Sequence, residues 1–157
     1  MKIVVMGVSG CGKSTIGRLL ADRLGYPFFD ADEFHPPANV AKMAAGTPLT
    51  DDDRQPWLGI LNGKLRAQES AVLACSALKE SYRRTLSQGL VDCRFVHLRG
   101  DIELIRARLA QRRHRYMPAS LLESQFAALE APQDAIDVQI ADAPAHCVDT
   151  VLRAVGH

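Results

Sequence analysis

The chain has 157 residues, of which 47% are hydrophobic and 24% charged, as is typical of a single globular domain. A formal net charge of +1 leaves no global positive field for binding nucleic acid, and no apolar run reaches the length of a membrane span. Four cysteines without a CxxC pair or metal-ligand spacing are typical of reduced thiols. We therefore expect a cytoplasmic protein that binds neither nucleic acid nor membrane.

Short apolar runs alternate with segments of helical period along the chain. The runs that predict buried strands are residues 2–6, 27–29, 71–75, 93–98 and 138–141. Apolar residues at spacings of three and four predict helices over 15–24, 101–112 and 119–130. This alternation predicts βαβ units, and therefore an α/β fold with a parallel sheet.

A glycine-rich stretch, GVSGCGKST, follows the first predicted strand. Gly7, four further residues and then Gly12, Lys13 and Ser14 give the spacing of a phosphate-binding loop between a strand and a helix. Backbone N–H groups of such a loop bind phosphate oxygens, the lysine reaches the β- and γ-phosphates, and the hydroxyl binds Mg²⁺. The alternative, a tight turn without a ligand, is disfavoured by the complete motif. The nucleotide-binding residues predicted here are Gly7, Ser9, Gly10, Cys11, Gly12, Lys13, Ser14 and Thr15.

Two absences narrow the class of nucleotide-binding protein. The sequence has no guanine-specific NKxD motif, and no predicted strand ends in the acidic pair that would supply a hydrolytic base. A chain of this length favours a small kinase that transfers the γ-phosphoryl group of ATP to a bound metabolite, with Mg²⁺ as the metal.

The second predicted strand ends in FFDADEFHPP, which contains Asp30 and Asp32. Because the carboxyl ends of parallel strands converge, both carboxylates should face the phosphate-binding loop. One can bind Mg²⁺ while the other accepts the proton of an attacking hydroxyl group. The alternative is that one of them caps the segment that follows.

The stretch TPLTDDDRQPWL has two interpretations. Its three aspartates, residues 51–53, could bind a metal, but Thr50 is a good N-cap, and acids in a first helical turn suit the helix dipole better. Arg54 could bind a carboxylate and Trp57 could form the floor of a pocket, or both could be surface packing.

Two cationic stretches follow. In CSALKESYRRTL, Lys79 and Arg83 are four residues apart and could receive an anionic substrate, or form a solvated helix face. The stretch RARLAQRRHRYMP could bind nucleic acid, but the low net charge favours a lid that neutralises the transferring phosphate. The arginines of the second stretch are Arg106, Arg108, Arg112, Arg113 and Arg115.

Taken together, these stretches resemble the gluconokinase family of small P-loop kinases, which phosphorylate D-gluconate at its 6-hydroxyl group with ATP. The resemblance spans nearly the whole chain and includes LRGD, YMPASLLESQFAALEAP and DVQIADAP. It implies a three-layer α/β/α fold with a five-stranded parallel sheet in the order 2-3-1-4-5. It also implies one kinase domain over 1–157, with a substrate-binding region near 32–69, a lid over 112–118 and a possible homodimer.

The resemblance also implies roles for single residues. Lys13, Asp32 and Arg112 would be catalytic, and Ser14 and Asp30 would hold Mg²⁺. Arg108 and Pro144 would lie on the nucleotide side. The residues implied around gluconate are Asp32, His35, Arg54, Lys79 and Arg83. Two alternatives remain open: a kinase of the same fold for another small anion, such as shikimate, and a nucleotide-binding regulator without transfer chemistry.

Overall fold

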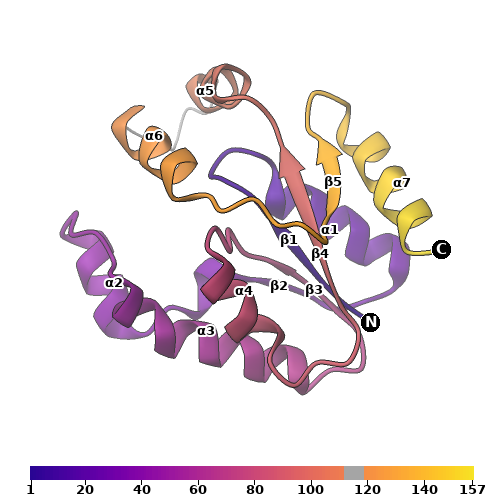
Figure 1. The fold of residues 1–157 in the computed structure, drawn as a ribbon, viewed down its shortest axis with the longest axis horizontal. Helices are drawn as coiled ribbons and strands as arrows, with labels where there is room; N and C mark the ends of the chain where they lie inside the picture. The colour runs from indigo at the N-terminus through magenta and orange to yellow at the C-terminus, as the bar shows by residue number, and fades with distance from the viewer. Residues whose placement is uncertain (112–118) are drawn as a thin grey trace.

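A computed structural model describes residues 1–111 and 119–157 of the chain (Figure 1). Its centre is a five-stranded parallel sheet in the order β2-β3-β1-β4-β5. The strands are β1 (Lys2–Met6), β2 (Phe28–Asp30), β3 (Ala71–Ala74), β4 (Cys93–Arg99) and β5 (Ile136–Gln139). The predicted fold class and strand order are thus confirmed.

The helices lie between successive strands, and one follows the last strand. They are α1 (Lys13–Leu24), α2 (Pro37–Ala44), α3 (Asp51–Arg66), α4 (Glu80–Ser87), α5 (Ile102–Ala110), α6 (Ala119–Ala128) and α7 (Pro144–Ala154), with a 3₁₀ helix, η1 (Ala31–Phe34), after β2. Within the described ranges, none of them has both the length and the apolar character needed to cross a bilayer.

The sheet separates two hydrophobic cores, because alternate side chains of a strand point to opposite faces. Ile3 and Val5 of β1 lie in the core that contains α1 and α7. Val4 and Met6 lie in the other core, with α3 and α4. Figure 1 shows the resulting three layers, with α5 leading away from the end of β4 and α6 beside it. This arrangement leaves the carboxyl ends of the strands as the place where loops converge.

Two strands are shifted along the chain relative to the prediction, while β3 and β4 differ from it by one residue at their ends. β2 lies one residue later than expected, and β5 lies two residues earlier. The apolar-run rule missed the start of β5 because polar residues, Asp137 and Gln139, alternate with Ile136 and Val138 in this edge strand. Alternation is the pattern of a strand with one buried face, whereas a continuous apolar run indicates a strand buried on both.

Helix α3 begins with a complete capping box. The Thr50 hydroxyl accepts a hydrogen bond from the Asp53 N–H, and the Asp53 carboxylate accepts one from the Thr50 N–H. Lys42 lies 2.7 Å from the same carboxylate and, with the Thr50 N–H, lowers the pKa of Asp53 to about 2. The helix-start interpretation of the aspartate run is therefore confirmed. Helix α3 also continues through Pro56, which has no N–H to donate to the carbonyl oxygen four residues earlier.

Candidate active site

The glycine-rich loop joins β1 to α1 and has a backbone that only glycine adopts readily. Gly10 has a φ of 84° and Gly12 a φ of 96°. A Cβ atom on Gly10 would also lie 2.9 Å from the Leu109 side chain of α5. Helix α1 then starts at Lys13 without any side-chain cap. Its first N–H groups and the positive end of its dipole are thus available to an anion such as a phosphate group.

Side chains from the start of α1 meet the end of β2. The Ser14 hydroxyl donates a 2.9 Å hydrogen bond to Oδ2 of Asp30. Oδ1 of Asp30 accepts a hydrogen bond from the Asp32 N–H, so Asp30 also caps η1. A hydroxyl and a carboxylate are oxygen ligands of the kind that Mg²⁺ prefers, and their proximity suits a metal at this point. The Lys13 ammonium group lies on the loop itself, 3.2 Å from the Val8 carbonyl oxygen.

Asp32 is the free carboxylate of this acidic pair. It is exposed in the first turn of η1, and no group in the described parts of the chain donates a hydrogen bond to its carboxylate. Its charge acts on His35 and on the Cys75 thiol at the end of β3. The capping alternative considered for this pair therefore applies to Asp30, which leaves Asp32 able to accept a proton.

A cluster of charged and aromatic side chains joins the start of α3 to the start of α4. Lys79 Nζ lies 3.1 Å and 3.2 Å from the two carboxylate oxygens of Asp51. The Tyr82 hydroxyl donates to the same carboxylate, and Arg54 and Lys79 each lie 5.7 Å from the centre of the Tyr82 ring. The hydrogen bond from Tyr82 and then the one from Lys79 lower the pKa of Asp51. Lys79 is therefore paired with an internal anion in this structure.

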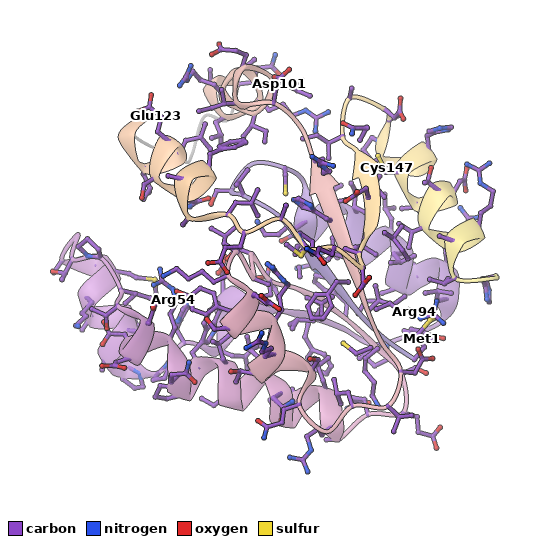
Figure 2. All side chains as sticks on the ribbon, viewed as in Figure 1. Met1, Arg54, Arg94, Asp101, Glu123 and Cys147 are labelled. Carbon is purple, nitrogen blue, oxygen red and sulfur yellow. The ribbon has the colours of Figure 1, made fainter. Side chains whose placement is uncertain are left out.

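Arg54 and Arg83 have different surroundings. Arg54 lies on α3 (Figure 2), donates to the Leu49 carbonyl oxygen at 2.7 Å and is partly exposed. Arg83 is only 7% exposed, and its two terminal nitrogens donate to the carbonyl oxygens of Ala77, Leu78 and Glu130. Arg83 thus anchors the β3–α4 loop to the segment after α6. Its predicted contact with a substrate stays a prediction, as does that of Lys79.

Helix α5 places Arg108 near the phosphate-binding loop, and its predicted contact with the nucleotide stays a prediction. Arg108 donates to the Ile140 carbonyl oxygen just after β5, and its charge acts on the thiol of Cys11 in the loop. Pro144 starts α7 a few residues further on. Arg112 and the predicted lid, residues 112–118, lie outside the described residues.

Two site neighbours were missed from the sequence. Gln125 of α6 accepts a 2.7 Å hydrogen bond from the Ser9 N–H and donates a 3.0 Å hydrogen bond to the Ser9 hydroxyl. Asn39 of α2 contacts His35, which stacks on Trp57 with ring centres 4.2 Å apart. Gln125 lies 116 residues from Ser9, whereas Asn39 lies only four residues after His35. Both lie in or beside stretches already singled out in the sequence, but nothing in these stretches marks the amides as site residues.

Figure 2 shows how the layers surround the strand ends. Asp101 at the start of α5 and Glu123 on α6 lie in one layer, and Arg54 lies in the opposite one. Met1 and Arg94 lie at the other end of the sheet. A phosphate-binding loop, a hydroxyl–carboxylate pair of the kind that suits Mg²⁺ and a free carboxylate just after β2 together define a small P-loop kinase.

Comparisons with known proteins agree with this class and narrow it. A family model described as shikimate kinase matches residues 9–149. A gluconokinase of Gluconobacter oxydans (strain 621H) is 51% identical over 84% of this chain and 76% of its own length, and a probable gluconokinase of Rattus norvegicus is 43% identical over 98% and 96%. The crystal structure of a gluconokinase from Sinorhizobium meliloti 1021 matches with a TM-score of 0.91 and 42% identity, over 98% of this chain and 90% of that one. The chain belongs to the gluconokinase family.

Proposed function

We propose that the protein transfers the γ-phosphoryl group of ATP to the 6-hydroxyl group of D-gluconate. The observation that carries this proposal is the arrangement of Ser14 and Asp30 beside the phosphate-binding loop, with the free carboxylate of Asp32 next to them. The 51% identical relative named gluconokinase supports the choice of substrate.

The chemistry assigns each residue a role. Asp32 accepts the proton of the substrate hydroxyl group as its oxygen forms a bond to the γ-phosphorus, and the bond from that phosphorus to the leaving oxygen of ADP breaks. Lys13 neutralises charge that develops on the transferring group. Ser14 and Asp30 would hold Mg²⁺, which supplies further neutralisation when it is bound. The loose transition state asks chiefly for alignment, so a weakly basic carboxylate suffices as the base.

The acceptor region, which comprises residues 32–69 together with Lys79 and Tyr82 of the neighbouring cluster, has side chains that suit a polyol carboxylate. Arg54 supplies a cation with a planar donor set, which suits a carboxylate, and His35 supplies a hydrogen-bonding ring near Asp32. For Lys79 to bind the substrate carboxylate, it would have to exchange its pairing with Asp51. On these grounds we assign 32–69 as the substrate-binding region. The lid predicted over 112–118 lies outside the described residues and stays a prediction.

A coupled assay of ADP release tests the proposal. Gluconate, shikimate, other sugar acids and an uncharged polyol are each offered with ATP and Mg²⁺, and ³¹P NMR identifies the product. We expect turnover with gluconate and a 6-phosphate product. Turnover with shikimate but not gluconate would overturn the substrate and support the same-fold alternative that the family model suggests. ATP binding without any transfer would support a regulator instead.

The base is tested separately with Asp32→Asn. Because the amide cannot accept the proton, kcat should fall by about 10²-fold or more. The matched control is Asp52→Asn, at an exposed position in the first turn of α3. An Asp32→Asn variant with nearly normal kcat would remove Asp32 from catalysis.

A further inference from the structure

A buried amide on α2 contacts the ring of His35. Asn39 is only 3% exposed, and its Nδ2 lies 3.0 Å from the Asp53 carbonyl oxygen and 3.3 Å from Nδ1 of His35. A carbonyl oxygen can only accept a hydrogen bond, so the NH₂ group of Asn39 faces Asp53. The second hydrogen of the same NH₂ group is then directed at His35.

This geometry determines which nitrogen of the imidazole carries a proton. Because Asn39 approaches Nδ1 with a donor, Nδ1 must accept, and the single proton of the neutral ring lies on Nε2. The plane of the ring is held as well, since it stacks on Trp57 with an angle of 13° between the planes. Trp57 is in turn held by a 2.8 Å hydrogen bond from its Nε1 to the Ala31 carbonyl oxygen.

We propose that Asn39 is a positioning residue that holds His35 as the neutral Nε2–H tautomer, so that the ring offers one donor to a hydroxyl group of the acceptor. The use of that donor by gluconate rests on the proposed function, whereas the tautomer does not.

The charges around the ring agree with a neutral donor. Burial lowers the pKa of His35; the carboxylate of Asp32 opposes this effect, and the guanidinium of Arg54 adds to it. A protonated ring would place a positive charge near Asp32 and make that carboxylate a weaker base. A neutral ring can instead donate to a substrate oxygen without weakening Asp32.

The tautomer can be measured without any substrate. In ¹⁵N-labelled protein at neutral pH, long-range ¹H–¹⁵N correlation spectra distinguish Nε2–H, Nδ1–H and charged rings. The five histidines of the chain give separate signals, and the His35 signal is the one lost in His35→Gln. We expect the Nε2–H pattern for His35. An Nδ1–H or charged pattern in the unmodified protein would overturn the proposal, whatever the variants do.

The role of Asn39 is tested with Asn39→Asp. A carboxylate only accepts, so it should draw a proton to Nδ1 and raise the pH at which the ring becomes charged. Trp57, the single tryptophan, reports that change, because a charged imidazole stacked on an indole quenches its fluorescence more strongly than a neutral one. The titration midpoint of fluorescence should therefore rise in Asn39→Asp. An unchanged midpoint and an unchanged tautomer would overturn the role.

Asn62→Asp is the matched control. Asn62 is also a buried amide, and its Nδ2 donates to the Leu86 and Gln88 carbonyl oxygens near the far end of α3. The two variants make the same chemical change and should both lose stability, but only Asn39→Asp should alter the signals of His35 and Trp57. Equal effects of both on these signals would reduce Asn39 to a structural residue.

Steady-state kinetics test whether gluconate accepts a hydrogen bond from the Nε2–H group of His35. If the ring donates to gluconate, Asn39→Asp should raise KM for gluconate about fivefold, as expected for one lost hydrogen bond, and leave KM for ATP unchanged. An unchanged KM for gluconate would refute use of the donor by the substrate. If the unmodified protein does not phosphorylate gluconate, the proposed function fails, while the NMR result still decides the tautomer.

Discussion

The phosphate-binding loop and the acceptor region are built in different ways. The loop, residues 7–15, is one continuous stretch whose shape depends on glycine backbone angles and on the start of α1. The acceptor region brings together side chains of η1, α2, α3 and α4, which contact one another across up to 31 residues of sequence. The loop binds phosphate through backbone groups, which other P-loop proteins also have. The acceptor region depends on side chains, and substrate choice therefore has to come from it.

Lys13→Ala should have the largest effect and tests the loop alone. Removing a cation that neutralises the transferring group should lower kcat by about 10²-fold or more. The melting temperature should hardly change, because the only hydrogen bond that the Lys13 side chain makes within the described residues is to the Val8 carbonyl oxygen. Steady-state kinetics and thermal melts measure both quantities. Lys2→Ala, at the other end of β1, is the control, and near-normal kcat in Lys13→Ala would contradict its role.

The same difference explains what could be predicted from the sequence. The loop follows from a pattern within a short window, whereas the strand order is implied by the family resemblance. The common edge of parallel strands predicts that Asp30 and Asp32 both face the loop, and in the structure Asp30 is the one that contacts Ser14. The clasp between Gln125 and Ser9 spans 116 residues, and no local periodicity encodes such a pair. The spacing of Lys79 and Arg83 showed two cations but not that one would be paired with Asp51 and the other buried on carbonyl groups. Partner choice at these positions is a property of the packed fold.

A pair of variants sharpens the comparison inside the acceptor region. Arg54→Ala should raise KM for gluconate about tenfold, because a charged hydrogen-bonding partner of the substrate is lost. Stability should change little, because the Arg54 side chain is only partly buried. Arg83→Ala should instead lower the free energy of unfolding by about 2 kcal/mol or more, since buried carbonyl groups lose their donors. Kinetics and urea denaturation separate the two effects. The opposite assignment of effects would make Arg83 the substrate-binding arginine.

Gln125→Ala tests whether the loop depends on α6 as well as on its own backbone. Gln125 makes two hydrogen bonds to Ser9 and so holds the loop in position. If their loss costs about 1 kcal/mol of transition-state stabilisation, kcat should fall about fivefold. Ser9→Ala keeps the backbone bond and should lose less. Ser124→Ala, exposed on the same helix, is the control. An unchanged kcat in Gln125→Ala would mean that the loop keeps its active shape through its own backbone and does not need α6.

The smallest effect concerns pH and again separates the two regions. Burial lowers the pKa of His35 in the acceptor region and of His97 on β4 below the ordinary value of 6.5. The unfolded chain then binds more protons than the folded one once the pH falls below about 6.5. The free energy of unfolding should therefore be highest above that pH and should decrease as the pH falls toward 5. Asp53, with a pKa of about 2, contributes no slope in this window.

Urea denaturation at a series of pH values from 7.5 to 5.0 measures this decline. His35→Gln should flatten it, because the glutamine does not titrate, whereas Cys11→Ser in the loop should leave the slope as it is. The Cys11 thiol has a pKa raised by burial, so it stays protonated across this whole range. A free energy of unfolding that stays constant or rises toward pH 5 would contradict the neutral state of the buried histidines. A slope equally flattened by both variants would mean that acid sensitivity does not distinguish the acceptor region from the phosphate-binding loop.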